Sequence, residues 1–538
     1  MQEKEFNLLE ESWIKVITPS LEQKEVSLLD VILHTHKYTG LSGETPTQDV
    51  AVLRVLLALV ETIFYRYNEN GEEDELLKDD APEMVLKRWK NYWAMGKFPE
   101  QAVRDYLKTW EERFWLFHPE TPFWQVSNLK YGTDYNLDCL FGNIKESNNK
   151  ATKHHFSMVD GKELTRLRYG EAVRWLIHLN AYAVNIKADK KEGVPGTTLP
   201  VKVGRLGQLG VVMMNGNHLF ETLMLNLCPL KKGEEPWGAP KPTWEKEVCV
   251  RQSNQIAPPD NLPELYTMQS RRIMLKREDG YVTGFRAMGG DFYSVEYDFN
   301  ANEPMTLWKG IKDKKLGKTI YVPRLHDPAV HAWREFPALF EKDEGGHKPG
   351  VVQWMQMLKT EKIIASQTLL TFRMVGIVYG DMQNYTFGDC VDDNIQMSAG
   401  ILEELGGEWI DLITEQVEKC RLVAEALKRL AAKLNKLFYG TGSAKSNIKD
   451  LLVSRYYFSI DHAFRQWLAG IDPTQGSRGE KLLEWERQSS YYARKVVEDY
   501  IATLGMDIFI YKEGDKGLLT VPSIQNEYYR ELRIIYKL

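Results

Sequence analysis

The chain is poor in cysteine and has no recognisable secretory signal. Only five of its 538 residues are cysteines, and they form no Cys-x-x-Cys pair and follow no regular spacing. A disulfide framework is therefore not expected, and a reducing compartment is favoured. We predict a cytoplasmic protein whose cysteines are buried free thiols.

Long hydrophobic runs are also missing. The most apolar segment is a predicted helix over 50–67, and it contains Arg54 and Glu61. It is shorter than the roughly 20 apolar residues that a membrane span requires. We therefore expect a core helix and no membrane partner.

The third deficit is positive charge. The formal net charge is -6, which is not typical of a protein that binds nucleic acid through its whole surface. Any contact with a polyanion must therefore come from a local patch. A protein that touches only one short duplex segment needs only a few Lys and Arg there.

Catalytic motifs are missing as well. The sequence has no Gly-x-Ser-x-Gly motif and no Gly-x-Gly-x-x-Gly motif after a strand. The segment 439–446 is similar to a phosphate-binding loop but lacks two of the required glycines, and it follows a helix, so a helix end is the better interpretation. A non-enzyme is the main hypothesis.

One motif keeps an enzymatic alternative open. His326 and Asp327 are adjacent, as are the metal ligands of HD phosphohydrolases, in which a bound divalent ion activates water. A single His-Asp pair is a weak signal. A metal-dependent phosphohydrolase or nuclease around this pair is therefore the alternative. Asp389, Asp392 and Asp393 could bind a cation, but they lack the spacing of a calcium loop and are interpreted as a helix N-terminus, where carboxylates suit the macrodipole.

The length predicts two or three domains, because single cores stop growing at roughly 250 to 300 residues. Residues 1–392 combine short strands, helices and long polar loops, which predicts an irregular mixed α/β domain. In residues 393–538 apolar side chains recur at three- and four-residue spacing. Helices are expected over 410–437, 444–468, 479–504 and 522–536. The predicted class is α+β, with a C-terminal antiparallel four-helix bundle.

Several segments resemble a known family when they are taken in order. They are FNLLEESWIKV (6–16), LLDVIL (28–33), FHPETPF (117–123), NGNHLFETLMLN (215–226), YTMQSRRI (266–273) and EPMT (303–306). In this order, and followed by a terminal bundle, they resemble the CasA family. CasA is the large subunit of type I-E Cascade, the RNA-guided surveillance complex of bacterial CRISPR immunity.

The resemblance implies a non-catalytic function. Family members read the protospacer-adjacent motif (PAM) in target double-stranded DNA, help start strand opening and R-loop formation, and help recruit a helicase-nuclease. Pairing with the guide RNA supplies the remaining specificity. The implied partners are guide RNA, target DNA, the other Cascade subunits and the helicase-nuclease. No cofactor is implied. No structural metal is expected, because the paired cysteines of some relatives are missing here. A scaffold subunit that does not read DNA is a further alternative.

The resemblance also implies DNA-contacting residues. Gln383, flanked by Met382 and Asn384, stands where the family has a hairpin glutamine that acts as a wedge beside the motif. A side chain there must fill the gap left by unstacked bases and satisfy their polar edges.

Two other family elements depart from the pattern. Lys187 and Lys190 stand near the place of a glycine-rich loop that approaches the minor groove. Arg286 is the nearest basic residue to the place of a basic finger around 288–290. We expect these three side chains to contact DNA.

The polar loop over 141–157 matches the family's flexible loop for the guide-RNA handle and neighbouring subunits. It offers phosphate donors and one ring for stacking. The candidate contact residues are Asn148, Asn149, Lys150, Lys153 and Phe156.

Overall fold

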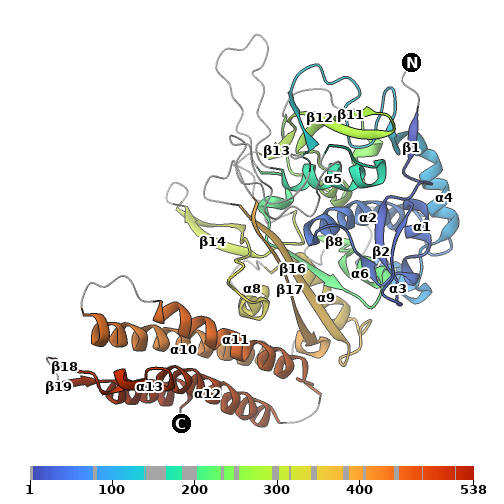
Figure 1. The fold of residues 1–538 in the computed structure, drawn as a ribbon. Coiled ribbons are helices and arrows are strands. Elements are labelled where there is room, and N and C mark those ends of the chain that lie inside the picture. Colours follow the sequence, from blue (N-terminus) through green and yellow to red (C-terminus); the bar gives the residue numbers. More distant parts are fainter. Residues whose placement is uncertain are drawn as a thin grey trace. The chain divides into compact units, whose positions relative to one another are not determined.

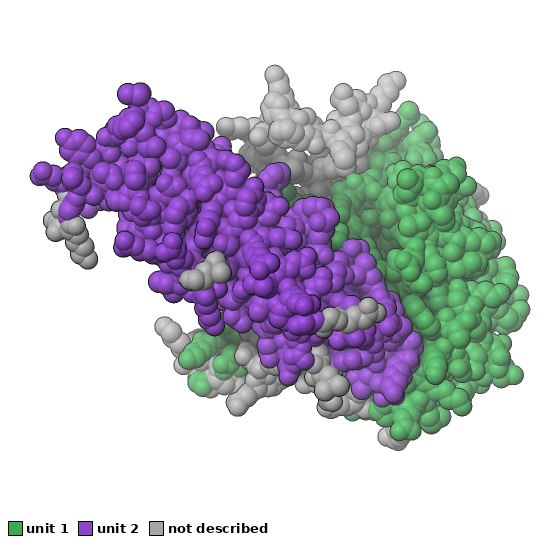
Figure 2. All heavy atoms as spheres, turned by 90° about the horizontal axis from the view of Figure 1, so that it is seen from below, with its two compact units in different colours: residues 1–330, 341–357, 371–394 green, residues 331–340, 358–370, 395–538 purple. Residues whose placement is uncertain are grey.

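The structure is a computed structural model, and it forms two compact units. The first consists of residues 1–330, 341–357 and 371–394, and the second of 331–340, 358–370 and 395–538 (Figure 2). The residues it describes are 4–76, 82–137, 140, 165–183, 203–231, 235–247, 254–293, 302–313, 317–340, 348–379, 387–403, 407–440, 447–474, 477–514 and 517–537. The domain boundary predicted between residues 392 and 393 stays a prediction.

Short strands and helices alternate along the first two thirds of the chain (Figure 1). The strands are β1 (Glu5–Asn7), β2 (Ile14–Ile17), β3 (Gln23–Val26), β4 (Gly40–Leu41), β5 (Trp115–Phe117), β6 (Thr133–Tyr135), β7 (Val211–Asn215), β8 (Leu230–Lys231), β9 (Glu235–Pro236), β10 (Asn254–Ile256), β11 (Arg271–Glu278), β12 (Tyr281–Gly289), β13 (Asp291–Tyr293), β14 (Trp308–Asp313), β15 (Lys318–Pro323), β16 (Leu369–Tyr379) and β17 (Phe387–Ser398). The helices are α1 (Leu28–Leu33), α2 (Pro46–Arg66), α3 (Pro82–Met95), α4 (Glu100–Thr109), α5 (Tyr169–Tyr182), α6 (Leu219–Asn226), α7 (Leu262–Tyr266), α8 (Phe336–Leu339) and α9 (Gly350–Thr360).

Helix α2 is the central core helix of the first unit, as predicted. Thr45 caps it by accepting a hydrogen bond from the Gln48 N–H, and Pro46 occupies its first position, where a missing N–H costs nothing. Two of its charged residues, Arg54 and Glu61, are buried in different ways. The Arg54 guanidinium lies 3.1–3.2 Å from the Glu303 carboxylate, whereas burial raises the pKa of Glu61 well above its usual value.

Two small sheets carry the candidate site. In one, β12 pairs antiparallel with both β11 and β6, so that Arg271 lies opposite Gly289 and Arg286 opposite Asp134. In the other, the strand order is β17-β16-β7. Strand β16 pairs antiparallel with β7, with Thr371 opposite Asn215.

The C-terminal region is helical. It contains α10 (Gly407–Tyr439), α11 (Ile448–Ala469), α12 (Arg478–Ala502) and α13 (Val521–Tyr536), with a hairpin of β18 (Tyr511–Gly514) and β19 (Gly517–Thr520) before the last helix (Figure 1). The helices pack through rings: Trp485 lies edge-on to Phe464 and stacked with Trp467. The α+β class with a C-terminal helical region is confirmed.

Two local predictions are wrong. The amphipathic pattern over 100–117 predicts one helix, but α4 ends at Thr109 and a 3-10 turn leads into strand β5. Asp389, Asp392 and Asp393 do not begin a helix but lie in strand β17. The Asp392 carboxylate pairs there with Arg373 of the neighbouring strand at 2.6 Å. Among the described helices, none combines the length and apolarity that crossing a bilayer needs.

Candidate nucleic-acid interface

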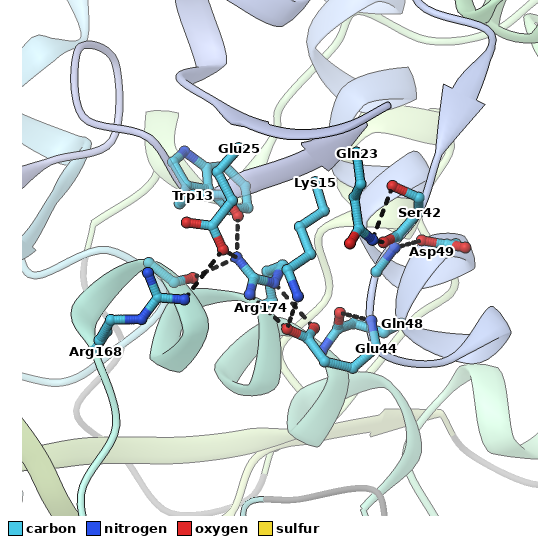
Figure 3. A network of polar contacts seen from close by, with 12 residues as sticks. Trp13, Lys15, Gln23, Glu25, Ser42, Glu44, Gln48, Asp49, Arg168 and Arg174 are labelled. Atoms are coloured by element: carbon cyan, nitrogen blue, oxygen red, sulfur yellow. Dashed lines mark hydrogen bonds and ion pairs between the residues drawn. The ribbon is translucent and has the colours of Figure 1, made fainter. Parts of the chain in front are cut away.

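Helix α5 links two of the segments for which nucleic-acid contacts are predicted, since 141–164 precede it and 184–202 follow it in the chain. Its first turns are held by Arg174, which is 1% exposed (Figure 3). The Arg174 guanidinium contacts the Trp13 carbonyl at 2.6 Å and the carboxylates of Glu44 and Glu25 at 2.5 and 3.2 Å. Lys15 lies 2.9 Å from Glu44. The start of α5 is thereby tied to the N-terminal strands.

The charges in this cluster compensate one another. Burial opposes ionisation of the Glu44 carboxyl, but hydrogen bonds from Arg174 and Lys15 outweigh it and lower its pKa to about 2. Glu44 is therefore ionised at neutral pH, and it holds both cations. This arrangement stabilises the fold around the start of α5.

The other end of α5 is held just as firmly. The Ala183 N–H donates to the Leu179 carbonyl, and the Gly204 N–H donates to the Ala183 carbonyl at 3.1 Å. The residues on either side of 184–202 are therefore bonded to each other. Lys187 and Lys190 lie outside the described residues, within this connection.

The base of the predicted wedge segment meets the same point. Tyr379 is the last residue of β16, and its hydroxyl donates to the Tyr182 carbonyl at 2.9 Å. Gly207 makes room for this contact, because a Cβ at that position would lie 2.0 Å from the Tyr379 hydroxyl oxygen.

Residues 380–386 connect β16 to β17, which are hydrogen-bonded neighbours. So short a connection requires β16 and β17 to run antiparallel. Met382, Gln383 and Asn384 lie in that connection, outside the described residues.

Arg271 completes this junction. It is 4% exposed, and its guanidinium donates to the Ala183 carbonyl at 2.9 Å and the Ser270 carbonyl at 2.7 Å. Burial lowers its pKa to about 10, so it remains charged at neutral pH. Its register partner Gly289 belongs to the region in which the basic finger is expected. We call Tyr182, Ala183, Gly207, Arg271 and Tyr379 the loop anchor.

Arg286 lies three residues before Gly289 in β12 and is already engaged. Its guanidinium nitrogens lie 2.8 and 2.9 Å from the Asp134 carboxylate, which also binds Lys276 at 3.0 Å. Hydrogen bonds from Arg286 and Lys276 hold the pKa of Asp134 well below its usual value. A DNA contact by Arg286 stays a prediction, and such a contact has to compete with this carboxylate.

The predicted guide-handle residues, Asn148, Asn149, Lys150, Lys153 and Phe156, all lie outside the described residues. The ends of their segment are described. Strand β6 precedes it, and after it Leu167 exchanges two backbone hydrogen bonds of 2.9 Å with Val282 of β12. Both ends therefore belong to the sheet that contains Arg271.

The metal-site alternative finds no support in the geometry. The His326 ring is 8% exposed, and its Nε2 lies 2.9 Å from the Val211 carbonyl oxygen. Burial lowers the pKa of His326. The Asp327 carboxylate accepts the Ala329 N–H. Within the described ranges, no three His, Cys, Asp or Glu side chains are grouped as metal ligands.

Sequence reasoning missed the loop anchor. Arg271 was included in the segment YTMQSRRI but had no role, and Tyr379 had none either. The available signals were a pair of arginines at a strand start and the glycines at 204 and 207, which indicate close backbone approach.

The fold and the loop anchor define an α+β protein in which the described ends of two connections, 184–202 and 380–386, meet at one junction. The family model for CRISPR-associated protein Cse1 matches residues 7–496. The chain therefore belongs to the CRISPR-associated Cse1 family, and the predicted resemblance to CasA is confirmed.

Individual relatives agree with this assignment. CRISPR-associated protein CasA/Cse1 of Thermus thermophilus is 24% identical over 505 residues, which cover 89% of this chain and 92% of the relative. The crystal structure of Thermobifida fusca Cse1 is similar with a TM-score of 0.82 and 25% identity, covering 99% of this chain and 98% of that one. A chain of a CRISPR RNA-guided surveillance complex has the same fold, with a TM-score of 0.72 at 18% identity over 98% of this chain and 100% of that one.

Proposed function

We propose that this protein is the large, non-catalytic subunit of an RNA-guided surveillance complex of type I-E. Membership of the Cse1 family supports this proposal. One relative with the same fold is a chain of a CRISPR RNA-guided surveillance complex. In this role the protein binds the other subunits and the guide RNA, with the handle contacts on Asn148, Asn149, Lys150, Lys153 and Phe156.

Within the complex, the proposed task is to recognise the PAM in target double-stranded DNA. The observation that carries this proposal is the loop anchor. The Tyr379-Tyr182 hydrogen bond joins the base of the segment with Gln383 to the base of the segment with Lys187 and Lys190. One segment is proposed to contact the minor groove and the other to wedge apart the first base pair. Both actions concern the same few base pairs of DNA, so it suits them that the two segments are attached at one point of the protein, the loop anchor.

The last step of the proposal is recruitment of the helicase-nuclease after strand opening. It rests on the family resemblance. The proposal contains no catalysis by this chain, and the burial of His326 against a main-chain carbonyl agrees with that.

The test is target-duplex binding by the guide-RNA complex, reconstituted with and without this chain, on duplexes with a randomised flanking motif. Salt is held constant, because phosphate contacts dominate raw affinity. We expect a flanking-sequence preference only when the chain is present. Gln383→Ala should then slow strand opening, measured by fluorescence of a base analogue beside the motif.

The matched control is Gln466→Ala, since Gln466 is an exposed glutamine of α11. It should leave opening unchanged. If preference and opening are identical without the chain, DNA reading is wrong and a scaffold role takes its place. Unchanged preference in both Gln383→Ala and Lys187→Ala would also favour the scaffold.

A further inference from the structure

A small cavity lies in the first unit, between the 3-10 turn that follows α4, the loop after β5 and the start of β11. Its volume is about 100 Å³. Arg113, Trp124, Lys246, Gln269, Arg272 and Asp291 are among the residues that line it. None of these residues has a role in the function proposed above. A cavity of this size holds several waters, or one small ion, but no nucleotide.

The three cations of the lining differ in how they are compensated. Arg272 lies 2.6 Å from the Asp291 carboxylate, and Lys246 is paired with Glu264. Arg113 donates only to the Lys246 carbonyl, at 2.8 Å. Within the part of the chain that the structure describes, it has no carboxylate partner. Burial alone lowers the pKa of Arg113, as expected for a cation that lacks a counter-ion.

The lining also holds donors without acceptors. The Trp124 indole Nε1 and the Arg272 Nε are buried, and neither has a hydrogen-bond partner among the described residues. Trp124 is moreover held at a φ of 58°, a conformation that bulky residues rarely adopt and that clusters at functional sites. Glu247, a lining carboxylate that has no ion pair among the described residues, is exposed, so solvent screens its charge.

We propose that this cavity binds one oxyanion of the size of phosphate, with Arg113 as its main charged ligand. Among the described residues one guanidinium N–H of Arg113 binds the protein, and the other N–H groups match the acceptor oxygens of a phosphate group. Lys246 and Arg272 are neutralised by Glu264 and Asp291, and solvent screens the charge of the exposed Glu247, so Arg113 is the cation that remains for one bound anion. The oxyanion is either free phosphate or the terminal phosphate of a nucleic acid.

The experiment is thermal unfolding of the full chain against inorganic phosphate, with ionic strength held constant by chloride. Phosphate also stabilises proteins in general, because it is excluded from their surfaces, and that effect does not saturate. Site binding instead gives a rise in Tm that follows the logarithm of phosphate above the dissociation constant. We expect such a rise for the wild type. Arg113→Gln should weaken the apparent phosphate affinity by about tenfold or more, as expected for loss of a charge-assisted hydrogen bond.

Two further variants serve as a control and as an independent test of the cavity. Arg104→Gln removes an exposed arginine of α4 that pairs with Glu100 and should keep the wild-type phosphate response. Gln269→Glu adds a carboxylate to the lining without removing the backbone contacts of residue 269, so it should abolish the response even if Arg113→Gln folds poorly. A phosphate response that is absent in the wild type, or equal in wild type, Arg113→Gln and Gln269→Glu, would overturn the proposal.

A second measurement identifies the source of the phosphate. Short oligoribonucleotides with a 5′-phosphate and with a 5′-hydroxyl are compared on the wild type and on Arg113→Gln. A phosphate-dependent difference that Arg113→Gln removes assigns the cavity to a nucleic-acid end. Equal binding of both oligoribonucleotides, together with an inorganic phosphate response, assigns it to free phosphate.

Discussion

Single charged residues inside the first unit are balanced by partners that lie far away in the sequence. Glu303 is an example: its side chain is 0% exposed and contacts the guanidinium groups of Arg54 and Arg205, the latter at 3.3 Å. A buried charge without its partner is costly. Such residues therefore control stability without touching any ligand.

Glu303→Gln should destabilise the chain strongly. The substitution removes the negative charge that two buried arginines share, and loss of one partner of a buried pair costs about 3–5 kcal/mol. Urea unfolding followed by tryptophan fluorescence measures it. Glu112→Gln is the control, because Glu112 pairs with Lys4 at the surface, where ion pairs contribute about 0–1 kcal/mol. Equal effects of the two substitutions would contradict this account.

Glu44 should make stability dependent on acid pH. Its pKa is about 2 in the folded protein against an ordinary value of 4.5. Because the folded pKa is lowered, the contribution of Glu44 is complete above pH 4.5 and is lost as pH falls toward 2. The shift corresponds to roughly 3 kcal/mol, less the part that solvent screens.

The measurement is the free energy of unfolding as a function of pH. Glu44→Gln should be less stable than the wild type at pH 7, and the gap should narrow as pH falls from 4.5. A gap that does not depend on pH would show that the carboxylate charge is not what Glu44 contributes.

At the scale of elements, the loop anchor joins a helix end to a strand end. Tyr379 and Tyr182 are 197 positions apart, yet one hydrogen bond links the bases of two long connections. If both connections contact DNA, as proposed, this bond positions them together.

Tyr379→Phe tests this link. It removes one hydroxyl and keeps the ring, so the loss of stability should be about 1 kcal/mol, while PAM discrimination by the assembled complex should fall severalfold. The measurement compares strand-opening rates on duplexes with a preferred and a disfavoured motif.

Tyr182→Phe is the matched control, because the Tyr182 hydroxyl is buried and has no hydrogen-bond partner among the described residues. That variant should keep the discrimination. Loss of discrimination in both variants would mean that ring packing, and not the hydrogen bond, positions the connections.

At the scale of the whole molecule, the net charge limits the affinity for DNA that the chain can reach and the number of its DNA contacts. The chain carries a formal charge of -6, so its overall field repels a polyanion and contacts must be few and local. Acting as proposed, a subunit of this kind would contribute sequence preference and not bulk affinity.

We therefore expect the isolated chain to bind duplex DNA weakly, and the complete complex tightly. Fluorescence anisotropy at about 50 and 200 mM salt measures this, because the slope of log affinity against log salt counts the phosphates neutralised. The chain should add little to the slope of the complex. A steep slope for the isolated chain would contradict the proposal that its DNA contacts are few.

Much of the local structure follows from the sequence. Thr45 and Pro46 mark the start of α2, Pro19 follows the end of β2, and apolar spacing reveals the terminal helices. Aromatic residues are less informative about local structure. The segment 110–117 has an apolar helix-like pattern but forms a turn and a strand. The reason is that the rings of Phe114 and Phe117 pack on side chains distant in the sequence. Short apolar runs fit both structures, and tertiary packing selects one.

The sequence by itself determined the family, the α+β class and the helical C-terminal region, because these depend on local periodicity, caps and the order of segments. Only the tertiary structure decided that Tyr379, Ala183 and Arg271 meet, that Arg286 is held by Asp134, and that Arg113 faces a cavity without a carboxylate partner among the described residues. These contacts join residues tens to hundreds of positions apart. Chain packing sets them, and no local pattern encodes which carboxylate or carbonyl a given side chain will reach.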